Sequence, residues 1–386
     1  MATTKRNFQY RIYPTGKQER QMEFVLYSCR RLWNHFLDQK IIAYKDDKKS
    51  ISCYTQINEI PKLSSRDESL KEVYSQTLQD VPRRLEKAFQ AFFRRCKTGE
   101  EPGFPRFKGK DRLNSFTYPQ NNGSFKIDEK NGRIYLSKIG HVKIKYHRLA
   151  KGKWKTCVVK KSSTGKWHVV ISTEIEFAKV KNDRPSVGID LGLKEFAVLS
   201  DGSRIKRERF FKTEEKALAK SQRRLAKQAR GTPERKKAKK VVARIHERIA
   251  DRRSNFTHQN SRMIADKYGT ICVENLDISG MMENKTITVN GKKLSAKPTH
   301  RSINDVAWNQ FVNQLSYKAE EAGGLVIQGN PKGTTQKCSA CGRVVPKDLG
   351  EREHKCSCGF ETGRDFNSSL NILAVGLHSL DVRKTA

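Results

Sequence analysis

The sequence predicts a multidomain α+β protein, and three observations carry that prediction. The chain has 386 residues, which is enough for two or three domains. Helical spacing of apolar residues dominates the first hundred residues, and short alternating segments of strand character follow it. After about residue 181, apolar strands alternate with helical stretches, which is typical of an α/β domain.

Charge is the strongest compositional signal. The chain carries 78 Lys and Arg against 41 Asp and Glu, a formal net charge of +37, with a pI near 10.0. A compact protein of that charge repels itself, and a bound polyanion would relieve the repulsion. A basic surface that serves only solubility is the alternative, but one-signed charge of this density favours nucleic-acid binding. Charge alone leaves DNA and RNA open.

No apolar run of about 18 residues occurs, so the sequence predicts no membrane span. The N-terminus carries no apolar stretch of the secretory type. We therefore expect a cytoplasmic protein whose nine cysteines stay reduced. Five of these cysteines are scattered singly and are expected to be small buried hydrophobes: Cys29, Cys53, Cys96, Cys157 and Cys272.

Residues 16–96 are predicted to form a helical domain. One amphipathic helix is expected over 22–37, and a second over 69–95 that Pro82 should kink or split. A polar linker is expected between them, over 54–66. The first helix has an apolar face made of Met22, Val25, Leu26, Cys29, Leu32, Trp33, Phe36 and Leu37.

Residues 1–15 and 97–180 are predicted to form a small, discontinuous β-barrel domain. Residues 10–14 read as a short strand, and a basic Gly/Pro-rich loop follows Cys96. Five further short strands are expected at 124–127, 133–136, 142–146, 156–160 and 166–173. Asn131-Gly132 is expected to form a hairpin turn between the first two of them. Lys at many outward positions favours a barrel that binds nucleic acid over a purely structural one.

Residues 181–386 are predicted to form an α/β domain. Apolar strands are expected at 187–192, 196–202, 269–275 and 324–330, with helices over 306–319 and from 365 onward. Between the second and third strands, residues 204–253 carry 20 Lys or Arg and 6 Asp or Glu. Helical spacing broken at Gly231 and Pro233 makes this stretch a basic helical hairpin, and its one-signed charge favours contact with phosphates.

Four cysteines are clustered near the C-terminus, in Cys338-Ser-Ala-Cys341 and Cys356-Ser-Cys358. Two thiolate pairs at that separation predict one structural zinc ion in a ribbon at about 334–362. A glycine follows each pair and lets backbone amides turn toward the sulfurs. Free or redox-active thiols are the alternative, and His354 could in principle replace one ligand. Four protein ligands would leave no open position for chemistry.

Three acidic residues lie in or next to apolar segments, where burying a charge costs free energy. Asp190 lies within an apolar strand, Glu274 ends a second one, and Asp365 opens the last helix. Each alone could be a strand-end carboxylate or, for Asp365, an ordinary helix cap. Together they suggest a shared Mg²⁺ site, because converging carboxylates repel each other unless a cation holds them.

An ordered set of motifs then resembles the TnpB family of transposon-encoded, RNA-guided DNA endonucleases, which is related to the type V CRISPR effectors. The motifs are YRIYPTGKQ with Trp33-Asn34, PRFKGK followed by Ser115-Phe116, VGIDLG, ICVENL, the four cysteines and RDFNSSLNI. They span nearly the whole chain. One departure concerns the last motif, where the family usually has a second Asp and Asn-Ala-Ala but this chain has Gly363 and Ser368-Ser369.

The resemblance implies a RuvC-like nuclease domain of RNase H fold with an inserted zinc ribbon. It also implies a β-barrel wedge domain and a helical recognition domain. Asp190, Glu274 and Asp365 would then hold two Mg²⁺ ions, with Asp190 bridging both, to hydrolyse a phosphodiester. Guide RNA would select the double-stranded DNA target beside a short flanking motif, and we expect a monomer with its RNA. Candidate readers of that motif are Tyr54, Gln76, Gln79, Ser115, Phe116 and Thr117.

Two other functions remain open on the residues alone. A non-catalytic nucleic-acid-binding regulator could keep a decayed nuclease fold, although the presence of all three acids argues against it. A transposase that joins strands would also use three acids, so the triad does not exclude it. The compact ribbon just before Asp365 favours the guided nuclease.

Overall fold

The computed structural model describes residues 2–177, 182–282, 286–289, 292–295, 297–330, 333–348 and 350–385. The chain forms two compact units, Met1–Ala178 and Lys179–Ala386. The boundary expected between residues 180 and 181, and residue 349 of the expected ribbon, lie outside the described residues.

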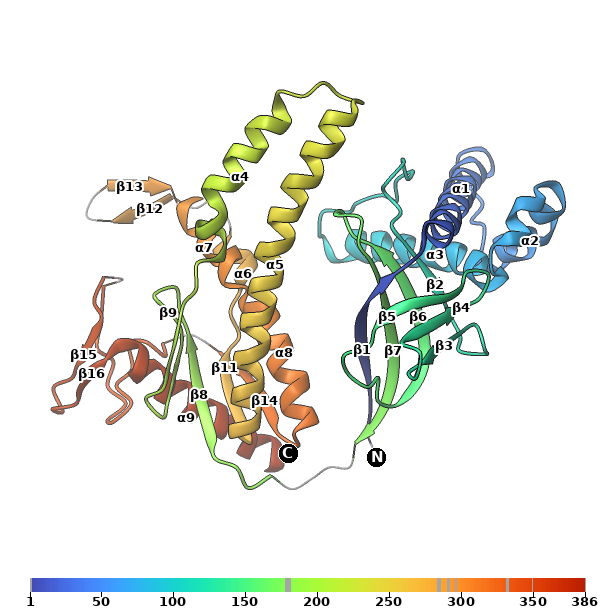
Figure 1. The fold of residues 1–386 in the computed structure, drawn as a ribbon. Coiled ribbons are helices and arrows are strands. Elements are labelled where there is room, and N and C mark those ends of the chain that lie inside the picture. The colour runs from blue at the N-terminus through green and yellow to red at the C-terminus, as the bar shows by residue number, and fades with distance from the viewer. Residues whose placement is uncertain are drawn as a thin grey trace. The chain divides into compact units, whose positions relative to one another are not determined.

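The first unit is built on a seven-stranded antiparallel sheet of order β2-β6-β7-β1-β5-β4-β3 (Figure 1). Its longest strands, β1 and β7, pair along nearly their whole length. The expected strands are therefore confirmed, with one more at 115–118 and a much longer first strand. The bounds are β1 Ala2–Tyr13, β2 Ser115–Tyr118, β3 Phe125–Asp128, β4 Arg133–Leu136, β5 Gly140–Lys145, β6 Lys153–Lys161 and β7 Trp167–Phe177.

Three helices and a 3-10 turn complete this unit: α1 Gly16–Asp47, α2 Cys53–Arg66, η1 Glu68–Glu72 and α3 Ser75–Thr98. The expected linker over 54–66 is wrong, because α2 fills it and begins at a Ser52 cap whose hydroxyl accepts from the Thr55 amide. The second expected helix begins later, at Ser75. Pro82 does not split α3, since the helix continues through it to Thr98.

The helices and the sheet share one hydrophobic core rather than forming separate cores. The Trp33-Asn34 motif and the PRFKGK motif contact each other in this unit. Trp33 donates its indole N–H to the Arg106 carbonyl at 3.1 Å. The Asn34 side chain accepts from the Lys108 amide at 2.7 Å and donates to the Lys108 carbonyl at 3.0 Å. The conspicuous basic loop is thus fixed against α1.

The second unit contains a five-stranded sheet of order β10-β9-β8-β11-β14. Strands β8, β9 and β10 form an antiparallel meander, while β11 and β14 run parallel to β8. The four expected strands are confirmed and the short β10 is additional. The bounds are β8 Ser186–Leu191, β9 Glu195–Leu199, β10 Arg204–Lys206, β11 Thr270–Glu274 and β14 Leu325–Gly329.

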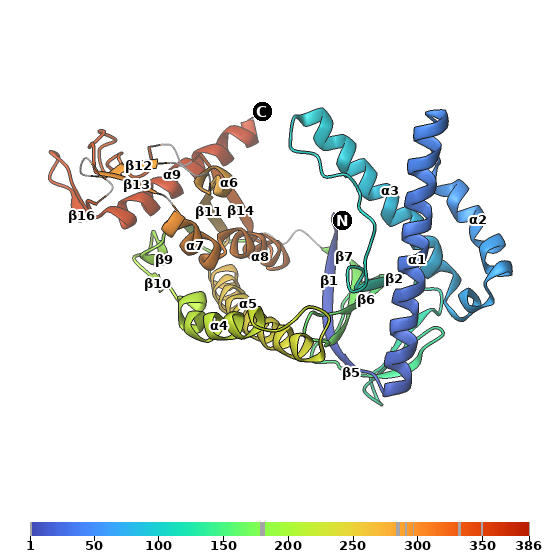
Figure 2. The same ribbon diagram turned by 90° about the horizontal axis from the view of Figure 1, so that it is seen from above.

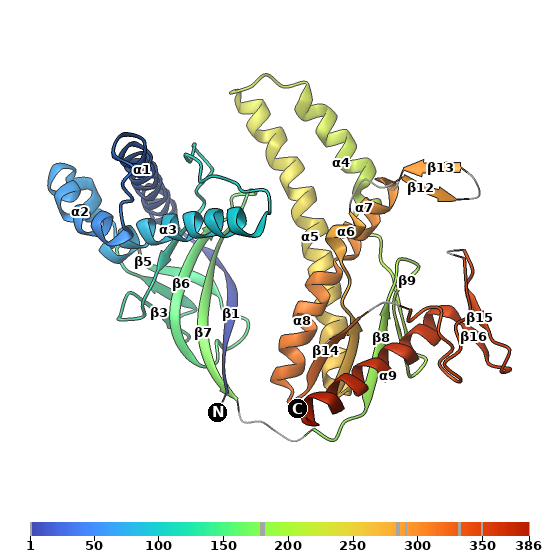
Figure 3. The ribbon, with the colours of Figure 1, turned by 180° about the vertical axis from the view of Figure 1, so that it is seen from behind.

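Helices cover both faces of this sheet. Alternate strand residues such as Ile189 and Val273 pack with apolar residues of α5 (Pro233–Lys267) and α8 (Trp308–Glu321). The opposite face meets α9 (Arg364–Thr385), which lies across the strands in Figure 3. Contact there is close, because a Cβ atom added to Gly188 would lie 2.1 Å from the Ser369 carbonyl oxygen.

The basic helical hairpin is confirmed. Helix α4 (Phe210–Ala226) and α5 lie side by side (Figures 1 and 2), and Thr232 caps α5 just before Pro233. Asp305 anchors the base of the hairpin, where it accepts from the Phe211 amide at 3.1 Å and from Arg253 at 3.0 Å. The remaining elements are α6 Ile278–Met281, β12 Thr286–Val289, β13 Lys292–Ser295, α7 Lys297–Val306, β15 Glu353–Lys355 and β16 Glu361–Gly363.

Among the described residues, no helix has the length and apolar character that crossing a membrane requires. Of the five single cysteines, Cys29, Cys157 and Cys272 are buried as expected. The expectation is wrong for Cys96, which is exposed near the end of α3, and holds only in part for the half-buried Cys53.

Candidate active site and metal centre

The three predicted acids come from elements that meet on the α9 face of the five-stranded sheet. Val273 of β11 pairs with Ile189 of β8, and these two side chains face α5 and α8. Because side chains alternate along a strand, Asp190 and Glu274, the next residue of each strand, are on the α9 face. Asp365 is the second residue of α9, which packs against both strands. The fold thus brings together three residues that are far apart in sequence.

The electrostatics of Asp190 show that the acids interact. Burial, together with the nearby carboxylates of Glu274 and Asp365, raises the pKa of Asp190 to about 8, and Arg364 opposes this shift. Within the described part of the chain, no group donates a hydrogen bond to the Asp190 carboxylate. Asp190 is thus a half-buried carboxyl group that has no hydrogen-bond donor and lies near two other carboxylates. A bound cation would be strongly favoured beside it.

The other two acids each have a partner. Glu274 is 9% exposed, and burial raises its pKa, while a hydrogen bond from Thr334 acts in the opposite direction. That bond joins Thr334 Oγ1 to Glu274 Oε1 at 2.6 Å. Asp365 is half-buried and lies 3.4 Å from the Nε atom of Arg364. Arg364 also donates to the Glu351 carbonyl, and its single positive charge cannot balance three carboxylates.

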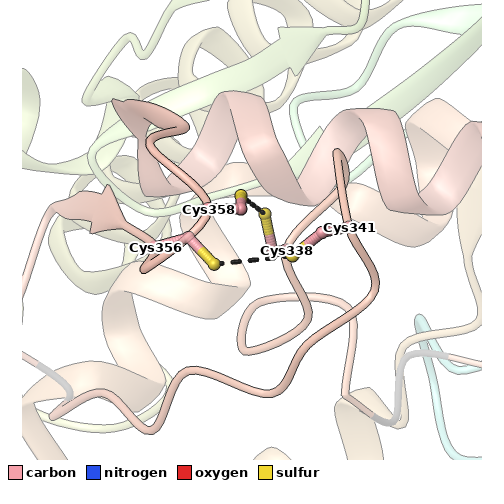
Figure 4. Close-up of side chains that lie close together, drawn as sticks. All are labelled: Cys338, Cys341, Cys356 and Cys358. Carbon is pink, nitrogen blue, oxygen red and sulfur yellow. Dashed lines mark hydrogen bonds between the residues drawn. The ribbon is translucent and has the colours of Figure 1, made fainter.

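The four predicted cysteines gather at one point (Figure 4). All four sulfurs lie within 4.8 Å of one another, with 3.8 Å between Cys338 and Cys358 and 3.6 Å between Cys341 and Cys356. A tetrahedral zinc ion with Zn–S bonds of about 2.3 Å places its sulfurs about 3.8 Å apart. The cysteine positions therefore fit zinc, and both sulfur–sulfur separations are far too long for a disulfide.

The backbone around the cysteines has the form expected of paired knuckles. Gly342 and Gly359 have φ values of 77° and 87°, which favour glycine. Their amides donate to the Cys338 and Cys356 carbonyls at 2.9 and 3.0 Å. The backbone amide of Cys358 is the largest of the influences that lower the pKa of the Cys356 thiol to about 6. A thiol of this kind is ready to bind metal as a thiolate.

His354 is not needed to replace a cysteine ligand, because all four cysteine sulfurs gather at one point. Its side chain is fully buried on β15, and its Nδ1 atom is hydrogen-bonded to the Lys347 ammonium group. The histidine packs beside Phe360, which indicates a role in the small core of the ribbon.

Sequence reasoning missed a set of hydrogen bonds that joins the cysteine ribbon to the acids. Asn367 is fully buried, and it accepts from the Ser339 amide at 2.9 Å and donates to the Lys337 carbonyl at 2.7 Å. Asn371 donates to the Lys337 and Thr334 carbonyls at 2.7 and 2.8 Å. The spacing of Asn367 and Asn371, one helical turn apart on the helix that carries Asp365, is the signal that could have revealed them.

Because the Thr334 hydroxyl donates a hydrogen bond to Glu274, we expect Thr334 to position that carboxylate. The variant Thr334→Val keeps the shape of the side chain but removes the hydroxyl donor, so Glu274 becomes free to turn. We expect cleavage to fall roughly 10- to 100-fold, the usual effect of losing a partner of a metal ligand, with a higher Mg²⁺ concentration for half-maximal rate. Thr334→Ser should restore both values. Thr335→Val is the matched control, and equal losses in both Val variants would refute this role.

The predicted DNA-reading residues differ in their exposure to solvent and in their hydrogen bonds. Tyr54 is 71% exposed on α2, whereas Gln76 and Gln79 are half-buried on α3. On β2, the Ser115 hydroxyl accepts from Arg84 at 3.0 Å and the Thr117 carbonyl accepts from the Thr77 hydroxyl at 3.0 Å. The prediction for Phe116 is wrong, because its side chain is 1% exposed within the core.

Three family models match the chain. They are described as "Probable transposase" over residues 168–285, "Cas12f1-like, TNB domain" over 308–372 and "Helix-turn-helix domain" over 1–49. The last name does not describe the structure of this segment, where a strand and one continuous helix occupy residues 2–47.

Two relatives and one solved structure extend over nearly the whole chain. "Putative RNA-guided DNA endonuclease InsQ" of Escherichia coli (strain K12) is 31% identical over 96% of this chain and 92% of its own. A "Putative RNA-guided DNA endonuclease" of Streptomyces pristinaespiralis is 30% identical over 98% and 90%. The fold is similar to a Cas12f1–sgRNA–target DNA complex, with a TM-score of 0.53 and 14% identity over 96% of this chain and 98% of that chain.

These matches identify the family. The chain belongs to the TnpB (OrfB) family, as its ordered motifs predicted. The mixed α/β fold is shared with Cas12f1.

Proposed function

We propose that this protein is an RNA-guided DNA endonuclease that uses Asp190, Glu274 and Asp365 to hydrolyse a phosphodiester. The convergence of these acids at one face of the sheet, with the pKa of Asp190 raised by burial and by its neighbours, carries the proposal. The sheet order supports an RNase H-like, RuvC-type domain, because a three-stranded meander is extended by two parallel strands. Both curated relatives bear names of the same activity.

The three acids are proposed to hold two Mg²⁺ ions rather than one. Ligand oxygens of one Mg²⁺ ion lie at most about 4.2 Å apart, since each bond is about 2.1 Å long. Among the described residues, the cysteines alone form a group of three or more ligands within 4.8 Å, so the carboxylates are spread more widely. Bound there, Mg²⁺ would supply a hydroxide nucleophile and stabilise the leaving oxygen. Asp190 is the acid best placed to face both ions.

The remaining parts have proposed roles in holding nucleic acid. Residues 16–96 would be the recognition domain, and residues 1–15 with 97–180 the wedge domain. The α4–α5 hairpin, which is rich in Lys and Arg, would contact a phosphate backbone. Residues 334–362 would form a structural zinc ribbon beside the catalytic acids. The candidates for reading the flanking motif remain Gln76, Gln79, Ser115, Thr117 and the exposed Tyr54.

The net charge of +37 predicts that the purified protein carries RNA. We expect a single RNA species of defined sequence that dissociates only at high salt. Its affinity should fall steeply with salt, because each neutralised phosphate releases about one counterion. Sequencing the co-purified RNA and measuring its binding at several salt concentrations test this directly.

The same preparation separates the proposal from its rivals. A guided nuclease should cut a DNA target that matches the RNA only when Mg²⁺ is present. A regulator would bind without cutting, and a strand-transfer enzyme would yield joined products. Protein that purifies without nucleic acid, yet cleaves DNA unaided, would overturn the guided mechanism.

A further inference from the structure

A small cavity lies beside Glu274, on the side of the strand ends where α8 begins. Its volume is about 270 Å³. Its polar lining consists of Glu274, Trp308 and four amide side chains, those of Asn275, Asn309, Asn313 and Gln328. Aliphatic side chains complete the wall. Ligand sites for small molecules usually start at about 300 Å³, so this cavity has room for one small planar group rather than for a duplex.

The four amides come from three segments, namely α8, β14 and the residue after β11, and line the same cavity. Asn309 and Asn313 are one helical turn apart on α8 and therefore share a face. Asn275 directly follows Glu274, and Gln328 lies on β14, paired with Val273. All four are exposed, and within the described part of the chain none has a hydrogen-bond partner. They are thus free to bind a ligand.

Trp308 supplies a second, independent observation. It is 5% exposed, yet its indole N–H is buried without a hydrogen-bond partner in the described structure. A buried tryptophan N–H usually finds an acceptor, so an unpaired one in the wall of a cavity indicates a missing partner. The preceding residue, Ala307, has a φ of 58°, which is strained for a residue other than glycine. This strained turn places Trp308 at the start of α8.

The chemistry of the described lining disfavours a phosphate group as the occupant. Among the described residues, no Lys or Arg lines the cavity, and without a bound cation the carboxylate of Glu274 would repel an anion. Amides both donate and accept hydrogen bonds, and asparagine and glutamine are suited to the paired donors and acceptors on the edge of a base. A neutral, planar group with donors and acceptors fits best.

We infer that this cavity receives one unpaired nucleobase of the DNA strand being cut, next to the phosphate held at Glu274, Asp190 and Asp365. The inference rests on the proposed nuclease function and adds a base-binding site to it. Holding the neighbouring base fixes the scissile phosphate relative to the metal site, because the two are joined by one sugar. A strand must be unstacked to enter, since a paired base cannot leave its duplex without cost.

The test replaces single nucleotides of the displaced, unpaired DNA strand by abasic sites, one at a time, around the mapped cut. An abasic site keeps the phosphate and removes the base. With guide-loaded wild-type protein and Mg²⁺, we expect one position at which cleavage falls roughly 5- to 100-fold, the discrimination that a bidentate base contact provides.

Two variants connect that loss to the cavity. In Asn309→Ala/Asn313→Ala, the intact target should be cut more slowly, and intact and abasic targets should differ by less than about twofold. Trp308→Phe, which removes the indole N–H and also makes the aromatic side chain smaller, should show a smaller loss at the same position. Asn304→Ala, an exposed asparagine of α7 outside the cavity, is the matched control and should keep the full difference.

The outcomes are distinguishable. If wild-type protein cuts no guided target at all, the proposed function fails. If it cuts every abasic target equally, or if the double variant keeps the position-dependent loss, the endonuclease stands and the base-binding cavity is refuted. A variant that slows intact and abasic targets by the same factor would indicate a contact to the sugar or backbone, which also contradicts the inference.

Discussion

Replacing Asp190, Glu274 or Asp365 singly by Ala is expected to abolish cleavage of a guided DNA target. Each change removes one carboxylate from the face of the sheet where three converge, and the two-ion geometry has no substitute ligand. The rate should fall on the order of 10³-fold or more, as it does when a member of a catalytic unit is lost. Binding of RNA and DNA should persist, because those contacts depend on Lys and Arg elsewhere.

The stability of the same variants gives a second measurement. Without Mg²⁺, Asp190→Ala should melt at the wild-type temperature or above it, because the folded protein loses one of three mutually repelling carboxylates. An inactive variant that also unfolds at low temperature would indicate a structural role. The measurements are plasmid cleavage in Mg²⁺, DNA-binding affinity and thermal melting without metal.

The best control is Asp277, three residues after Glu274. It is exposed and accepts a hydrogen bond from the Gly280 amide at 3.0 Å, so Asp277→Ala should still cut. Asp201→Ala should also cut but lose stability, because Asp201 accepts from Lys267 at 2.8 Å and from the Tyr268 hydroxyl. Near wild-type cleavage by Asp190→Ala or Glu274→Ala would show that the site assignment is wrong.

The local sequence patterns were sufficient to predict the sheet that holds the acids. Asp190 and Glu274 interrupt apolar runs, and an apolar run that ends in an acid indicates both a buried strand and a functional group at its end. The cysteine pairs likewise combine ligand type and spacing in one short segment. Such signals work because the residues that carry them are near each other along the chain.

Contacts between distant segments had no comparable signal. Asn367 and Asn371 look like ordinary polar residues of an amphipathic helix, yet Asn367 is buried and holds the ribbon. Phe116 was predicted to read DNA together with its neighbours Ser115 and Thr117, but strand alternation turns its side chain into the core. The segment over 53–66 was predicted to be a linker because it is mostly polar. It forms a helix whose buried face is narrow and consists of Gln56 and Ile60.

The unusual Ser368-Ser369 pair has a simple structural reason. Both serines are fully buried where α9 crosses β8 at Gly188. At so close an approach only small side chains fit, and serine meets that demand as alanine does.

Zinc removal is the second prediction with a large expected effect. A ribbon of this size has little core of its own, so zinc binding should supply roughly 10 kcal/mol or more of its folding free energy. Cys338→Ser or Cys356→Ser should release zinc and unfold residues 334–362 locally. Metal analysis of the variants measures the first effect, and hydrogen exchange measures the second.

Loss of the ribbon should also reduce cleavage, through identified bonds. The first cysteine pair holds the Ser339 amide and the Lys337 carbonyl against Asn367, two residues after Asp365. When the ribbon unfolds, these bonds and the Thr334 donor to Glu274 are lost together, so both acids become less well positioned. Hydrogen exchange should therefore increase over 364–371 as well. Cys96→Ser, which changes an exposed cysteine of the other unit, should alter none of these values. Active wild-type protein that contains no zinc would contradict the prediction, as would a Cys338→Ser variant that loses zinc yet cuts at the wild-type rate.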